Sequence, residues 1–413
     1  MNDLLLPPGT RLLHIGPHKT GTTALQIALG KNRDALLRQG VRYIWGGEHL
    51  NANLAALAVA KRPTRRFSSA KPVPIEHWTS LVEKANLASA DERVIISGEE
   101  FCSAQEPTIE KIVHDLNPSK LQIVITLRSI DKIFASQWQQ YVQAGAVTKS
   151  LDEWLRSALG NETDIENIRR FWVRHRHDQL VKRWARAVGK DRVTVVALDE
   201  SNREHLYSTF EQMLGLMKGS IRAEDRLVNR SMTLFEAEAV RSMYSLLKDQ
   251  GIGELADHVR FMISPSELIK RHRKPQQNEP RIKIPEWARG QVHKLGVDMI
   301  SEIRGIGVRI VGNLESIVPP EKSDGKSNNS PQSEGHATTI PVDLAGWTAY
   351  GVIVSSGISR GDLPPAPTST LPFVWLRRAT GSQLMREVMR RVRIRLLQPF
   401  SRLRSEKKKG DGL

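Results

Sequence analysis

The chain of 413 residues contains one cysteine, Cys102. A single thiol cannot form a disulfide within the chain or build a cysteine-based metal cluster. A chain with one thiol suits a reducing compartment, so we expect a cytoplasmic protein with no metal site.

Long apolar runs are also missing. No unbroken apolar stretch approaches the roughly 18 residues that a membrane-spanning helix needs. The N-terminal segment MNDLLLPPGTR has no basic region and only Leu4–Leu6 as an apolar patch, unlike a secretory signal. These absences predict a soluble protein.

Acidic residues are fewer than basic ones, 45 against 61, which gives a formal charge of +16. Residues 377–409 hold twelve Lys or Arg and only two acids, so the other 380 residues carry about +6. This distribution gives little support to nucleic-acid binding by the main body, and we expect no nucleic-acid partner. A modest positive charge is suited to a pocket for a multiply anionic ligand.

The most informative stretch is residues 11–28, RLLHIGPHKTGTTALQIA. An apolar strand stops at Gly16 and a helix-forming run begins at Thr22, so the loop between them presents backbone N–H groups and a helix N-terminus to an anion. The spacing approaches that of the nucleotide-triphosphate loop, G-x-x-x-x-G-K-[ST]. Here, however, Thr22 follows Gly21 and the cation comes earlier, at Lys19. The missing magnesium-binding Lys-Ser/Thr pair predicts an anhydride ligand that reacts without a divalent ion.

The string HIGPHKTGTTALQ resembles the 5′-phosphosulfate loop of bacterial PAPS-dependent sulfotransferases. That family moves the sulfuryl group of 3′-phosphoadenosine-5′-phosphosulfate (PAPS) to a hydroxyl or amine. A second family signature, an arginine at a strand end with a serine eight residues later, is matched by Arg128 and Ser136 in LQIVITLRSIDKIFASQW. The resemblance implies PAPS as cofactor without a metal, with Arg128 and Ser136 on its 3′-phosphate. It assigns the phosphosulfate to Lys19, Thr20, Gly21, Thr22 and Thr23. The late RKGxxGDWK string of mammalian cytosolic members is absent, so adenine contacts stay unassigned.

Sulfuryl transfer needs a cation for the leaving oxygen and a base for an alcohol acceptor. Lys19 is predicted to supply the cation. Ser97-Gly-Glu99 is similar to a Ser-x-Glu of bacterial relatives, which makes Glu99 the first candidate base and Glu100 the second. These carboxylates could equally cap the next helix or pair with an arginine. His18 either acts as a further acid or base or packs under the loop, and His14 is expected to be a satisfied core histidine.

Apolar strands near 12–15, 41–45, 93–97, 121–127 and 192–198 alternate with amphipathic helices. This alternation predicts a three-layer, P-loop-like α/β domain with a central parallel sheet flanked by helices. We assign residues 1–318 to this domain, 319–341 to a disordered linker, and 342–413 to a C-terminal extension with a basic amphipathic helix at 382–397.

Three questions stay open at this point. The basic helix suits an anionic membrane surface, which would place the protein at the inner membrane face. It equally suits an acidic partner or nucleic acid, or plain solvation. A magnesium-dependent P-loop kinase and a membrane-surface binding protein with a vestigial loop are the competing functions. The acceptor, a carbohydrate, lipid or small molecule, cannot be chosen from the loops that would bind it.

Overall fold

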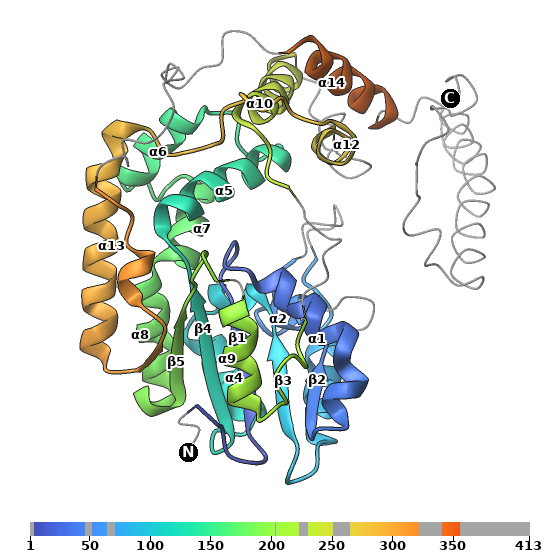
Figure 1. Cartoon of the computed structure of the whole chain (residues 1–413), viewed down its shortest axis with the longest axis vertical. Helices are drawn as coiled ribbons and strands as arrows, with labels where there is room; N and C mark the ends of the chain where they lie inside the picture. Colours follow the sequence, from blue (N-terminus) through green and yellow to red (C-terminus); the bar gives the residue numbers. More distant parts are fainter. Residues whose placement is uncertain are drawn as a thin grey trace, which may run out of the picture. The chain divides into compact units, whose positions relative to one another are not determined.

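Six parallel strands form the central sheet of the computed structural model (Figure 1). They are β1 (Arg11–Ile15), β2 (Val41–Ile44), β3 (Arg93–Ser97), β4 (Leu121–Leu127), β5 (Val193–Ala197) and β6 (Arg309–Val311). Their order is β2-β3-β1-β4-β5-β6, so β1 lies between β3 and β4. The predicted α/β fold with a parallel sheet is confirmed.

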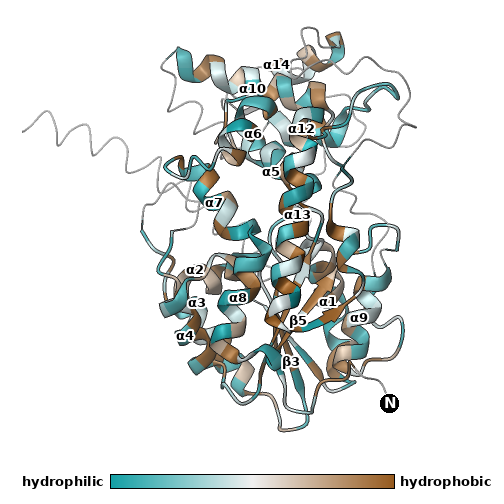
Figure 2. Ribbon diagram, turned by 90° about the vertical axis from the view of Figure 1, so that its left-hand side faces the viewer, coloured by the Kyte–Doolittle hydropathy of each residue, from teal (hydrophilic) through white to brown (hydrophobic). Residues whose placement is uncertain are grey.

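Alternate residues of the strands face opposite sides, which gives the domain three layers. On one side, Leu13, Ile96 and Ile125 pack with side chains of helices α2 (Asn53–Val59), α3 (Glu76–Asn86), α4 (Glu106–Asp115), α8 (His177–Val188) and α13 (Glu286–Ile306). On the other, Leu12 and Val124 pack with helices α1 (Thr22–Leu37) and α9 (Glu204–Leu214). Figure 2 shows the hydrophobic strands between helices with hydrophilic outer turns.

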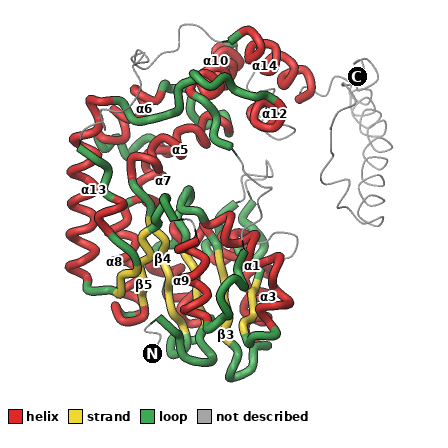
Figure 3. The backbone as a smooth tube through the Cα atoms, viewed as in Figure 1, coloured by secondary structure: helices red, strands yellow, loops and turns green. Residues whose placement is uncertain are grey.

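A second core contains none of the described strands and is built mainly from helices, which are red in Figure 3. It contains α5 (Ile130–Gln143), α6 (Leu151–Leu159), α7 (Glu166–His175), α10 (Leu234–Asp249), α12 (Pro265–His272) and α14 (Val342–Ser355). Within it, Phe134 stacks on Phe171, and Trp154 meets both rings edge to face. Helix α13 packs against both cores, with Ile303 against the sheet and Val292 against the helices. In Figure 1 these helices lie beyond the carboxyl ends of the strands.

The structure describes residues 4–45, 52–63, 71–202, 204–222, 230–250, 265–321 and 341–355. These belong to a compact unit that runs over Met1–Ser356. Helix α14, which the sequence analysis assigned to the extension, is part of this unit. Most of the predicted linker and the whole basic helix at 382–397 lie outside the described residues.

The described helices include none that is long and apolar enough to cross a membrane. Residues 166–175 form helix α7 and residues 265–272 form helix α12, and the sequence analysis expected neither of these helices.

Candidate functional site

The predicted site residues come from segments that leave the sheet at one edge (Figure 1). The loop 16–21 follows β1, the 3-10 helix η1 (Glu99–Ser103) follows β3, and Arg128 follows β4. Because β3 and β4 flank β1, these segments meet where the strand order changes direction. In open parallel sheets, such a point is where ligands bind.

The loop after β1 depends on two glycines and one strained lysine. A Cβ at Gly16 would lie 2.0 Å from Oγ1 of Thr22, so a side chain there would collide with the start of α1. Gly21, at φ 77°, and Lys19, at φ 73°, both adopt the left-handed conformation. That conformation is uncommon for a lysine, and strained backbone of this kind concentrates at functional sites.

Hydroxyl groups hold the loop to the sheet below it. Thr20 Oγ1 donates to the Pro17 carbonyl at 2.7 Å and lies 3.0 Å from Oγ1 of Thr126 on β4. Thr22 Oγ1 donates to the Gly16 carbonyl at 3.3 Å. Thr20 and Thr22 are buried and use their hydroxyl hydrogens inside the loop, whereas Thr23 is exposed.

His14 lies beneath this loop and is fully buried. Its ring nitrogens are 2.8 Å from Ser97 Oγ on β3 and 3.2 Å from Thr126 Oγ1 on β4. Burial lowers the pKa of His14 to about 3, against a small opposing effect of Glu99, so the ring is neutral at physiological pH. The expectation of a satisfied core histidine is confirmed.

Lys19 is partly buried at the turn of the loop. Burial lowers its pKa, Glu99 opposes this, and the positive charges of Lys270 and Arg128 lower it further. Three cations from distant parts of the sequence therefore lie within electrostatic range of each other, with Lys270 contributed by α12. Such a cluster is unfavourable by itself and is stabilised by an anion.

His18 lies between the two candidate carboxylates. Its Nδ1 is 3.2 Å from Glu99 and its Nε2 is 3.3 Å from Glu100, and all three side chains are less than a fifth exposed. The second contact is an ion pair without hydrogen-bond alignment, since Nε2 has no hydrogen-bond partner. Burial and Arg174 disfavour a proton on His18, but Glu100 and Glu99 outweigh them and raise its pKa.

Glu100 is held by cations on its other side. Arg174 of α7 donates to both of its oxygens at 3.1 and 3.3 Å, and Arg62 lies 3.8 Å away. Burial alone would raise the pKa of Glu100, but Arg174 and His18 bring it far below its ordinary value. Burial likewise opposes ionisation of Glu99, while His18 and Lys19 lower its pKa. Both carboxylates are therefore ionised near neutral pH.

Arg128 lies against the loop. Its Nη1 donates to the backbone carbonyl of Lys19 at 3.1 Å, and its Nε donates to Glu200 at 2.6 Å. Ser136 is two turns into α5, where its hydroxyl donates to the Lys132 carbonyl at 2.6 Å. The structure thus joins Arg128 directly to the loop after β1 and connects Ser136 to that loop through Lys132, Glu200 and Arg128.

Five charged residues of this region were missed by the sequence analysis: Arg62, Arg174, Lys270, Glu200 and Lys132. Glu200 could have been found from the sequence, because it follows a predicted parallel strand just as Glu99 does. Arg174 and Lys270 were missed because both are on helices that the sequence analysis did not predict.

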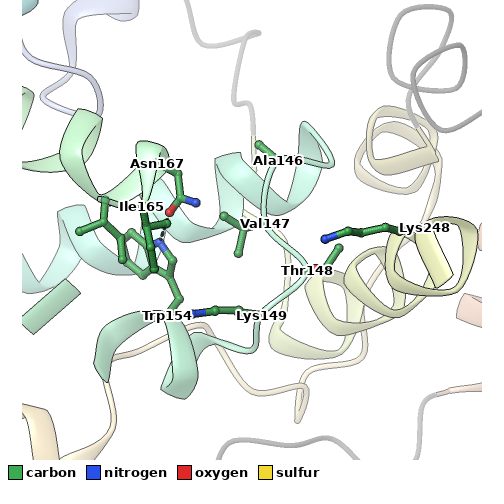
Figure 4. A pocket seen from close by; sticks show the side chains of 9 residues that line it. Ala146, Val147, Thr148, Lys149, Trp154, Ile165, Asn167 and Lys248 are labelled. Atoms are coloured by element: carbon green, nitrogen blue, oxygen red, sulfur yellow. Dashed lines mark hydrogen bonds between the residues drawn. The ribbon is translucent and has the colours of Figure 1, made fainter. Parts of the chain in front are cut away.

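No group of three metal-ligating side chains is arranged to hold an ion among the residues that the structure describes. A cavity of about 170 Å³ lies elsewhere, between the segment after α5, helices α6 and α7, and Lys248 of α10 (Figure 4). Trp154 donates to Asn167 on its wall at 2.9 Å. None of the predicted site residues lines this cavity.

The likeness of this chain to known proteins is structural and weak. No family model and no curated protein matches the chain. Among solved structures, the crystal structure of a sulfotransferase from Alicyclobacillus acidocaldarius is similar over 62% of this chain and 95% of its own, with a TM-score of 0.38 and 15% identity. This likeness is too low to carry that protein's activity over to this chain.

Proposed function

We propose that this protein is a sulfotransferase that moves the sulfuryl group of PAPS to a hydroxyl or amine acceptor. The proposal depends most on one contact, the 3.1 Å hydrogen bond from Arg128 to the Lys19 carbonyl. Two segments 109 positions apart in the sequence, each resembling an anion-binding signature, are thereby held in direct contact.

The chemistry assigned to this site is an in-line displacement at sulfur. A bond forms between the acceptor atom and sulfur while the bond from sulfur to the 5′-phosphate oxygen breaks, and the electron pair stays on that oxygen. Lys19 and the N–H groups at the start of α1 stabilise the developing charge, because they are already in place before the reaction. PAPS supplies the activated sulfuryl group, and Arg128 and Ser136 are assigned to its 3′-phosphate.

The acceptor proton requires a base, and the geometry favours Glu99 or His18 over Glu100. The negative charge of Glu100 is already balanced by the positive charges of Arg174 and Arg62. Glu99 has a lowered pKa, so it is ionised but a weak base, and it lies 3.2 Å from Nδ1 of His18. His18 has a raised pKa and becomes a base only when it has lost its proton.

The pH dependence of kcat/KM separates these two roles. If Glu99 accepts the proton, kcat/KM is flat from about pH 6 to 8, because its carboxylate is ionised throughout. If His18 accepts it, kcat/KM rises through the raised pKa of the imidazole, and His18→Gln abolishes this rise.

Calorimetry tests the function as a whole. We expect 3′,5′-adenosine bisphosphate to bind without a divalent ion and ATP to bind more weakly, with or without magnesium. Transfer of labelled sulfate from PAPS to a panel of sugars, lipids and phenols then identifies the acceptor class. Magnesium-dependent ATP binding with no bisphosphate binding would instead establish a kinase.

A further inference from the structure

Glu200 connects two cations next to the loop. The segment that follows β5 carries it, and its carboxylate oxygens accept from Arg128 Nε at 2.6 Å and from Lys132 Nζ at 2.5 Å. Burial would raise the pKa of Glu200, but the two cations lower it, so the carboxylate stays ionised.

The two cations converge on a single anionic group. Arg128 is held in place by its second bond to the Lys19 carbonyl, and Lys132 is on the first turn of α5, one turn before Ser136. Each oxygen of Glu200 takes one charge-assisted hydrogen bond, which is how a phosphate binds an arginine and a lysine.

Glu200 is able to leave this position. Its side chain is 39% exposed, and it lies in an irregular segment between β5 and α9. The neighbouring Asp199 fixes this segment by accepting from Ser201 N at 2.9 Å and touches neither cation. Rotation of Glu200 toward water would therefore free Arg128 and Lys132 without unfolding the segment.

We propose that Glu200 and the 3′-phosphate of the nucleotide compete for Arg128 and Lys132, and that Lys132 is a further ligand of this phosphate. The inference rests on the proposed function. A nucleotide with a 3′-phosphate displaces the carboxylate and takes over both cations. A nucleotide without that phosphate cannot displace the carboxylate and gains nothing from this pair.

The competition lowers affinity in a calculable way. The apparent affinity equals the intrinsic affinity multiplied by the fraction of time for which Arg128 and Lys132 are released from Glu200. Removal of the Glu200 carboxylate should therefore tighten the binding of 3′-phosphorylated nucleotides and of no others. If Glu200 merely oriented Arg128, its removal would weaken binding instead.

The experiment is calorimetry of the full chain with 3′,5′-adenosine bisphosphate and with 5′-AMP, which lacks the 3′-phosphate. We expect Glu200→Gln to tighten bisphosphate binding about tenfold and Lys132→Gln to weaken it about tenfold, with 5′-AMP changed less than about twofold. Asp199→Asn, which removes the same charge one position earlier, should change neither ligand. In the Lys132→Gln background, the gain from Glu200→Gln should shrink.

The outcomes are distinguishable. If the wild type prefers the bisphosphate but Glu200→Gln leaves its affinity unchanged or weakens it, the competition is disproved and the sulfotransferase proposal stands. If the wild type binds bisphosphate no better than 5′-AMP, both proposals fail. Thermal melts of each variant, with Glu200→Ala as a second substitution, verify that the fold is intact.

Discussion

At the scale of single residues, Lys19 combines a cost to the fold with a proposed benefit to the reaction. Burial lowers its pKa, so its charged form is less favourable in the folded chain than in the unfolded one. By linkage, this residue reduces stability at neutral pH. Trading stability for activity in this way is common in functional sites.

Lys19→Met should therefore raise the denaturant midpoint at pH 7 while lowering kcat about 10²–10³-fold, the usual loss when one stabilising donor is removed. Urea unfolding and labelled-sulfate turnover measure the two effects. Lys111→Met is the control, because Lys111 is paired with Asp115 on the exposed side of α4. A Lys19 variant that keeps full turnover would remove this lysine from the reaction.

His18 makes the opposite contribution. Its pKa is raised by Glu100 and Glu99 above the ordinary value of 6.5, so its protonated form stabilises the fold. This stabilisation is complete below about pH 6.5 and is lost as the pH rises through the raised pKa.

The free energy of unfolding of the wild type should therefore exceed that of His18→Gln by more at pH 6 than at pH 9. This excess should shrink steadily as the pH rises. Urea unfolding across this range measures it, and His77→Gln on the exposed surface of α3 serves as control. A constant difference would show that the imidazolium is not held by its carboxylate neighbours.

At the scale of elements, the loop after β1 requires glycine at its first position, Gly16. Gly16→Ala would place a methyl group 2.0 Å from Oγ1 of Thr22, so the loop or the first turn of α1 has to move. We expect a loss of about 1–3 kcal/mol, typical of overpacking, together with weaker bisphosphate binding. Gly290→Ala in α13 is the matched control, since nothing lies within 4 Å of its added Cβ. If Gly16→Ala and Gly290→Ala have the same bisphosphate affinity and the same melting temperature, the loop accommodates the added methyl group.

The elements also explain what could be predicted from the sequence. β1, β3 and β4 were predictable because each is a short apolar run that stops at a polar or glycine residue. That placed Lys19, Glu99 and Arg128 at one edge of the sheet. Helix α7 was missed, although Ile168 and Phe171, which it buries in the second core, and His175 recur at helical spacing. The pairing of Arg174 with Glu100 depends on that core, so no local spacing indicates it.

At the scale of the whole chain, α14 packs against α12, the helix that carries Lys270. Arg273 is fully buried and pairs with Glu236 of α10, with Glu279, and with Asp343 of α14 at 2.8 Å. Trp347 stacks on His272 of α12, with ring centres 5.8 Å apart. Since α12 also carries Lys270, the packing of α14 supports a helix that contributes charge near the loop.

Truncation tests this dependence. A chain that ends at residue 341 loses the buried Leu344 and one carboxylate partner of Arg273, so we expect a loss of about 3–5 kcal/mol from exposed apolar surface and a disturbed buried ion pair. A chain that ends at Ser356 keeps the compact unit and should match the full chain within about 1 kcal/mol. Urea unfolding of the three proteins measures both differences. Equal stability of all three would mean that α14 packs on the second core without stabilising it, and that Lys270 needs no support from residues beyond 341.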